Sequence, residues 1–230
     1  MSALLAWLVH LYTASGILFA VFALLLIEQG FYQSVFWLMS LAVVVDATDG
    51  TMARKVRIKE VIPWFDGDRL EDIVDYLNYV LVPCALIVRA GLLPQNALWL
   101  AGLPLLASAY GFCQCEAKTA DHYFLGFPSY WNIVTFYFYV LGTPGWLNVS
   151  LLSVFAVLVF VPIRYVYPSR TPILRGLTVT LGILWGFMIL ATIYLLPDPP
   201  TLLAHGSLLF PIYYAALSFW LEIRSWKAGV

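Results

Sequence analysis

Charged residues and cysteines are scarce in this 230-residue chain, and each shortage narrows the class of protein. Only 11% of the residues are Asp, Glu, Lys or Arg, whereas a soluble domain has roughly 25%, so a soluble globular protein is excluded. The formal net charge of −1 offers no basic field for nucleic acid. The three cysteines (Cys84, Cys113 and Cys115) show no CxxC spacing, so we interpret them as packing residues rather than metal ligands.

Apolar sequence is what the chain has in excess. Its residues are 62% hydrophobic, with a mean hydropathy of +0.87. A helix needs about 17–25 apolar residues to cross a bilayer, and eight runs reach this length or approach it: Ala14–Ile27, Phe31–Val45, Ile73–Ala90, Leu98–Phe112, Tyr130–Leu141, Val149–Pro162, Leu174–Leu195 and Ser207–Leu221. The sequence predicts an all-α, polytopic integral membrane protein with about eight transmembrane helices. Without repeats or a linker, residues 1–230 form a single domain.

The basic residues predict how this domain is oriented. An even number of spans puts both termini on one side, and eleven of the twelve Lys and Arg residues fall there, leaving only Arg89 opposite. Positive charge marks the cytoplasmic side, so both termini are expected in the cytoplasm. Met1–His10 contains no Lys or Arg, which argues against a cleavable signal peptide. Residues 2–12 are a candidate for an interfacial helix before the first span.

An acid-rich stretch lies between the second and third apolar runs. Residues 46–80 hold eight of the thirteen acidic residues. Asp46 and Asp49 are three residues apart, and Glu71 and Asp75 are four apart, so each pair shares a helix face. One ionised side chain at the centre of a spanning helix costs about 2.5–3.5 kcal/mol. A divalent cation between the two helices would offset that cost, and hard carboxylate oxygens suit Mn²⁺ or Mg²⁺.

Two readings of this stretch compete. Glu60, Asp66 and Asp68 could be ordinary solvated charges near a helix end. Asp46, Asp49 and Asp75 adjoin long apolar runs, where such charges are more often functional. Small residues allow a phosphate to approach the backbone, and an Arg beside a carboxylate-bound metal is a natural phosphate ligand. Gly50, Ala53 and Arg54 supply both features, and together with the carboxylates they fit phosphoryl transfer.

These residues carry a family resemblance. Asp46-x-x-Asp49-Gly50-x-x-Ala53-Arg54, followed by Gly67-x-x-x-Glu71-x-x-x-Asp75, resembles the signature of the CDP-alcohol phosphotransferases. The resemblance implies the fold of that family, two divalent ions (Mn²⁺ or Mg²⁺) held by Asp46, Asp49, Glu71 and Asp75, and Asp75 as general base. It also implies a nucleotide and phosphate site at Gly50, Ala53, Arg54, Gly67 and Thr13, with Arg54 assisting catalysis.

The sequence departs from the family pattern at two points. The twelve residues between Arg54 and Gly67 form a longer gap than in many members. The third acidic position is Glu71 rather than Asp. Asp72 is the alternative ligand, although it points about 100° away on a helix, and register favours Glu71.

A second unusual stretch, Phe112–Val140, combines acidic residues with a crowd of aromatic ones. Aromatic faces with nearby carboxylates hold quaternary ammonium groups, but Trp and Tyr also form belts at the ends of ordinary spans. This stretch, the later segment Phe160–Pro172 and the segment Val9–Gly16 are similar to bacterial phosphatidylcholine synthases. The candidates for binding the ammonium group are Glu116, Asp121, Tyr130, Trp131 and Asn132, with Tyr76 and Tyr79 as residues that could instead simply pack.

That resemblance implies a complete reaction. CDP-diacylglycerol and choline would be converted to phosphatidylcholine and CMP at the cytoplasmic face of the bacterial inner membrane, with membrane lipids as partners and a homodimer as an expected state. Two alternatives stay open. The acceptor could be serine, inositol or glycerol phosphate, or the acids could bind the coupling ion of a transporter, which predicts a pseudo-symmetry that the sequence lacks.

Overall fold

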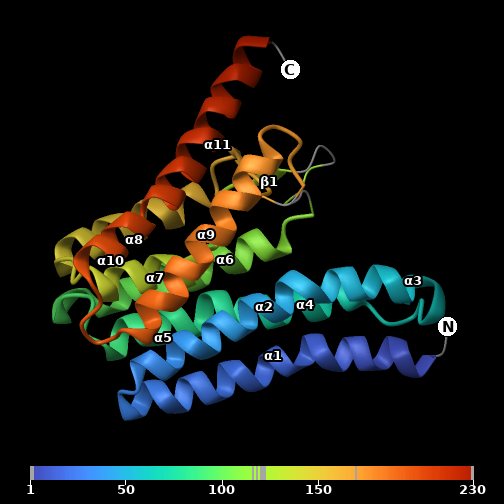
Figure 1. Cartoon of the computed structure of the whole chain (residues 1–230), viewed down its shortest axis with the longest axis horizontal. Helices are drawn as coiled ribbons and strands as arrows, with labels where there is room; N and C mark the ends of the chain where they lie inside the picture. The colour runs from blue at the N-terminus through green and yellow to red at the C-terminus, as the bar shows by residue number, and fades with distance from the viewer. Residues whose placement is uncertain (1–2, 116, 118, 120–122, 169, 229–230) are drawn as a thin grey trace.

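The computed structural model describes residues 3–115, 117, 119, 123–168 and 170–228, and it is mostly helical (Figure 1). The elements are α1 (Ala3–Gln29), α2 (Tyr32–Val56), α3 (Ile58–Val61), α4 (Gly67–Asp75), a π-helical turn η1 (Tyr76–Leu81), α5 (Val82–Arg89), a 3₁₀ segment η2 (Gln95–Ala101), α6 (Gly102–Cys113), β1 (Tyr123–Leu125), α7 (Trp131–Val140), α8 (Gly145–Leu158), β2 (Arg164–Val166), α9 (Arg175–Tyr194), α10 (Thr201–Ser207) and α11 (Leu209–Ala228).

Five stretches of helix in the described part of the chain are long and apolar enough to cross a membrane. They are Ala3–Gln29, Tyr32–Val56, Gln95–Cys113, Arg175–Tyr194 and Thr201–Arg224. Large apolar side chains such as Leu18, Phe22 and Leu25 are more than half exposed on α1, as expected where lipid rather than protein covers a helix. The chain is therefore a multi-pass membrane protein.

The other three expected spans fall on shorter helices. Ile73–Ala90 covers the end of α4, η1 and α5, while Tyr130–Leu141 covers α7, and Val149–Pro162 covers α8. A helix of ten residues such as α7 is about 15 Å long, half the thickness of the hydrocarbon core. The count of eight spans, with both termini in the cytoplasm, stays a prediction. Residues 3–12 continue into the first apolar run as one helix, and their interfacial placement also stays a prediction.

The two N-terminal helices form an antiparallel pair. The turn at Gly30 joins α1 to α2, and Figure 1 shows α3 close to the N-terminus at the opposite end of the pair. The side chains that α1 buries against its neighbours are mostly small, including Ala6, Thr13, Ala20 and Ala23. Small residues allow membrane helices to approach closely. On another side of α1, Gly16 allows α4 to approach, since an added Cβ there would lie 2.5 Å from Val74 Cγ1.

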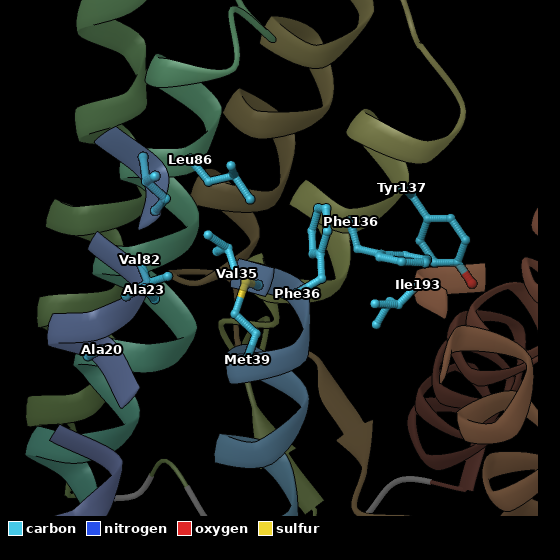
Figure 2. Close-up of a cluster of buried hydrophobic side chains, with 11 residues drawn as sticks. Ala20, Ala23, Val35, Phe36, Met39, Val82, Leu86, Phe136, Tyr137 and Ile193 are labelled. Carbon is cyan, nitrogen blue, oxygen red and sulfur yellow. The ribbon is translucent and has the colours of Figure 1, made fainter. Parts of the chain in front are cut away.

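One of the apolar cores lies where five helices converge (Figure 2). Ala20 and Ala23 of α1 face Val35, Phe36 and Met39 of α2. On the other sides, α5 contributes Val82 and Leu86, α7 contributes Phe136 and Tyr137, and α9 contributes Ile193. The Phe36 and Phe136 rings meet edge to face at 5.4 Å. Because α5 continues α4 through η1 without a break, this core sets the position of α2 relative to α4. The acids of the stretch lie on these two helices.

The all-α prediction requires one correction. β1 and β2 form a two-stranded antiparallel ribbon, in which Tyr123, Phe124 and Leu125 pair with Val166, Tyr165 and Arg164. The ribbon packs against α11. Apolar-run counting could not find it, because each strand has three residues and its partner lies about forty residues away along the chain.

Candidate metal and substrate site

Three carboxylates converge between α2 and α4. One oxygen each from Asp46, Glu71 and Asp75 lies within 4.8 Å of the others. Asp46 comes from α2, whereas Glu71 and Asp75 are one turn apart on α4. Negative charges this close repel one another, and hard oxygen donors at this spacing suit Mn²⁺ or Mg²⁺. The donor set therefore fits a divalent cation. Among the described residues Asp72 does not join this group.

Asp49 lines the same cavity as Asp46 and Asp75, and it is hydrogen-bonded to α1. It is only 4% exposed, and its Oδ2 accepts a hydrogen bond of 2.8 Å from the Thr13 hydroxyl of α1. This small cavity of about 10 Å³ lies between these helices, lined by Thr13, Ala42, Val45, Asp46, Asp49, Val74, Asp75, Asn78 and Tyr79. Such a cavity has room for about one water-sized particle. Asp46 and Asp75 thus belong both to the carboxylate group with Glu71 and to the cavity with Asp49.

Three further acids of the stretch are paired with basic residues close to them in the chain. Glu60 lies 3.8 Å from Arg57, and Asp66 lies 3.0 Å from Arg69 and caps α4 by accepting from the Arg69 backbone N–H. Lys59 Nζ donates to Asp68 Oδ2 at 2.6 Å, and this hydrogen bond raises the pKa of Lys59. All these side chains are largely exposed, so the reading of Glu60, Asp66 and Asp68 as solvated loop charges agrees with the structure.

Curated relatives identify the family to which this geometry belongs. Phosphatidylcholine synthase of Pseudomonas aeruginosa is 35% identical over 225 residues, which cover 97% of this chain and 92% of the relative. The chain belongs to the phosphatidylcholine synthase family. As a member it is a transferase of phospholipid biosynthesis. No family model matches the chain.

Two further phosphatidylcholine synthases extend the similarity. The one from Legionella pneumophila is 50% identical over 167 residues, covering 72% of this chain and 66% of the relative. The one from Borreliella burgdorferi is 36% identical over 194 residues, covering 83% of this chain and 82% of the relative. Both matches span most of the present chain, as the resemblance over several separate segments predicted.

The predicted phosphate-binding residues of this synthase homologue lie at the edge of the carboxylate site. Gly50, Ala53 and Arg54 continue α2 beyond Asp49, and the Arg54 guanidinium folds back to donate to the Thr51 hydroxyl at 3.0 Å. Gly67 begins α4, and an added Cβ there would lie 2.8 Å from His10 Cε1. Glycine at position 67 therefore leaves room for the His10 side chain, a contact that the sequence alone did not reveal.

The second unusual stretch forms a tightly bonded corner. At Gly126 the backbone has φ +82°, and an added Cβ would lie 2.4 Å from the Val159 carbonyl oxygen. Ser129, with φ +55°, shares a hydrogen bond of 2.8 Å with Ser108, which also accepts from the Trp131 indole N–H at 2.7 Å. These contacts hold the chain on both sides of Tyr130. The corner therefore has a defined conformation, which an interfacial belt does not require.

The structure shows the surroundings of two candidates for binding an ammonium group. Trp131 is fully buried and its indole N–H is bonded within the corner. Asn132 is buried too, and its side-chain oxygen accepts from the Ile133 N–H. Both side chains thus take part in local hydrogen bonds, and their role in binding choline stays a prediction. Glu116 and Asp121 lie outside the described residues.

Tyr130 has aromatic neighbours that the sequence did not place beside it. Its ring centre lies 6.0 Å from that of Tyr214 on α11, and Tyr214 stacks on Tyr165 of β2 at 6.4 Å. Three segments far apart in the chain thus bring tyrosine rings together. Only tertiary structure could reveal this, because no spacing links positions 130, 165 and 214.

Proposed function

We propose that the protein transfers the phosphatidyl group of CDP-diacylglycerol to choline, giving phosphatidylcholine and CMP. One observation carries the proposal. In a chain of the phosphatidylcholine synthase family, Asp46, Glu71 and Asp75 bring their oxygens within 4.8 Å of one another where α2 meets α4. The resemblance to the CDP-alcohol phosphotransferases predicted these residues for the metal site before the fold was known.

Asp46, Asp49, Glu71 and Asp75 would hold the divalent metal, as Mn²⁺ or Mg²⁺ and as two ions by family resemblance. When bound, the metal would offset the negative charge of the pyrophosphate and of the departing nucleotide. Thr13 supports this arrangement because it donates to Asp49. The inclusion of Glu71 rather than Asp72 in the converging group favours Glu71 as the third ligand.

The donor substrate would approach from the membrane with its acyl chains in lipid. Arg54 would bind phosphate oxygens, for which its planar guanidinium is suited. Gly50 and Ala53 leave the adjacent surface of α2 free of large side chains, and Gly67 with Thr13 completes the proposed nucleotide and phosphate site. Gly50, Ala53 and Arg54 follow Asp49 on α2, and Gly67 begins the helix that carries Glu71 and Asp75, which supports a shared site.

Asp75 is proposed as the general base. It would accept the proton of the choline hydroxyl while the hydroxyl oxygen forms a bond to the phosphorus that bears the diacylglycerol. The bond from that phosphorus to the CMP oxygen breaks, and CMP leaves with the bonding electron pair. A base is useful here because a free alcohol is a poor nucleophile at neutral pH.

Tyr130, Trp131 and Asn132 are the candidates for the choline ammonium group among the described residues, and Tyr130 is the least buried of the three. A cation over a tyrosine face gains about 0.5–2 kcal/mol, and Tyr130 lies beside the aromatic ring of Tyr214. We also propose that the chain crosses the membrane eight times. Both termini and the active site would lie on the cytoplasmic side of the bacterial inner membrane. The basic residues on that side support the orientation. Homodimerisation is proposed from family resemblance alone.

The first test is a direct assay in detergent. The purified protein receives CDP-diacylglycerol, Mn²⁺ and isotopically labelled choline, with serine, inositol and glycerol phosphate in parallel reactions. We expect label in the chloroform phase only with choline, and none after EDTA treatment. Transfer to another alcohol alone would keep the chemistry and reject choline. A folded protein that releases no CMP with any alcohol would contradict the proposed reaction.

A further inference from the structure

Tyr79 makes a contact that the proposed mechanism has not used. It lies on η1, directly after the helix that carries Glu71 and Asp75, and its hydroxyl donates to Asp46 Oδ2 at 2.9 Å. Tyr79 also lines the small cavity between the carboxylates. The hydroxyl therefore joins the α4–η1 helix to the metal candidate on α2, across the site itself.

The backbone under Tyr79 is unusual and well anchored. At the end of η1 the Val82 N–H bonds to the Leu77 carbonyl, five residues back. Asn78 donates from its side-chain amide to the Val74 carbonyl and to the Gly16 carbonyl of α1, each at 2.9 Å. π-helical turns are rare and are often found at functional sites. Here the turn is held from its own helix and from α1, which fixes the base of the Tyr79 side chain.

The same turn directs its two tyrosines to different neighbours. Tyr76 donates to the Leu105 carbonyl of α6 at 2.9 Å, whereas Tyr79 donates to Asp46 of α2. The two hydroxyls thus have similar hydrogen-bond lengths and lie on one turn. Only the Tyr79 hydroxyl reaches a carboxylate of the converging group. Tyr76 is therefore a matched internal control.

We propose that Tyr79 is a positioning residue for the metal ligand Asp46. Its hydroxyl fixes the rotation of the Asp46 carboxylate, so that an oxygen of Asp46 stays near those of Glu71 and Asp75. Groups that hydrogen-bond to metal ligands orient them and tune their affinity, and their loss typically weakens metal binding about 10–100-fold. This inference rests on the metal site of the proposed function, and it gives Tyr79 a role other than choline contact or simple packing.

The test measures metal binding without turnover. Mn²⁺ is titrated into the detergent-purified protein, without substrates, and free Mn²⁺ is followed by electron paramagnetic resonance. Tyr79→Phe removes only the hydroxyl, and we expect about a tenfold or larger rise in the Mn²⁺ dissociation constant. Tyr76→Phe removes the matching hydroxyl and is expected to leave that constant unchanged. In the assay, excess Mn²⁺ should restore the kcat of Tyr79→Phe.

Each other outcome has a defined meaning. Mn²⁺ binding by Tyr79→Phe equal to that of the unmodified protein would overturn the inference, as would equal weakening in Tyr76→Phe. A kcat that stays low at every Mn²⁺ concentration would show a structural role instead. Asp46→Asn separates this inference from the metal site, because unchanged Mn²⁺ binding in that variant would reject the site itself. Thermal unfolding of each variant verifies that it is folded.

Discussion

The two distinctive regions of this protein are built in opposite ways. The carboxylate site draws its acids from residues 46–75, a single short part of the chain on two adjoining helices. The aromatic corner around Tyr130 combines α7, β2 and α11, which lie far apart in sequence. Helix spacing is a local property, so the first region could be predicted from the sequence, and the second could not. Their proposed roles differ as well, since one binds phosphate and metal and the other discriminates the acceptor.

Asp75→Asn should give the largest loss of activity, because it removes a negative charge from the carboxylate site. Loss of a general base typically lowers a rate by about 10²–10⁴-fold, and Asp75 is also a candidate metal ligand. CMP release from CDP-diacylglycerol in the presence of choline measures this effect. Asp68→Asn is the matched control, because Asp68 is exposed and bonded to Lys59, and its rate should change little. Equal loss of activity in both variants would contradict a special role for Asp75.

Gly126→Ala should have the next largest effect, on stability. A Cβ in the left-handed region costs about 1–2 kcal/mol, and overpacking adds about 1–3 kcal/mol, since the Cβ would lie 2.4 Å from the Val159 carbonyl oxygen. The midpoint of thermal unfolding in detergent should fall. Gly30→Ala isolates the strain alone, because Gly30 has φ +78° and no atom within 4 Å of the added Cβ. Equal shifts in both variants would show that the contact at Val159 has no effect.

Glu222→Gln tests whether the ribbon holds the aromatic corner. Glu222 on α11 is 9% exposed, accepts from the Arg164 backbone N–H and lies 3.4 Å from the Arg164 Nε. Weakening a hydrogen bond to a charged group costs about 1.5–3 kcal/mol. We expect a lower unfolding midpoint and a higher KM for choline, with Mn²⁺ binding unchanged. Glu28→Gln is the control. It should lower the free energy of unfolding by less than about 1 kcal/mol, because the ion pair of Glu28 with Arg89 is exposed.

Tyr130→Leu should have the smallest effect on activity, and the effect should be selective for choline. Loss of a cation–π contact of about 0.5–2 kcal/mol would raise the KM for choline by about 2–30-fold and leave the KM for CDP-diacylglycerol unchanged. In the uncharged isostere of choline, a tert-butyl group replaces the trimethylammonium group. The KM for this isostere should be the same in the variant as in the unmodified protein. Tyr139→Leu is the control, because Tyr139 packs against Tyr32 and Phe36. Parallel losses with choline and its isostere would contradict cation recognition by Tyr130.

Predictions from sequence succeeded where the physical cause was local. The periodic spacing of Asp46, Glu71 and Asp75 and the signature around them predicted residues that the fold brings together. Apolar runs predicted a multi-pass membrane protein. No spacing in the sequence predicted a hydrogen-bond partner for Trp131, which stays a candidate for binding the ammonium group. The structure directs its indole N–H to Ser108.

The sequence by itself determined the membrane-embedded helical class, the position of the acid-rich stretch and the membership of a phosphotransferase family. These depend on composition and on spacing within single helices, which the chain carries along its length. The tertiary structure alone decided that Thr13 bonds to Asp49 and Tyr79 to Asp46, and that Tyr130 lies beside Tyr214. Such contacts depend on the distance and rotation between helices, and these follow from packing across the whole core rather than from any one segment.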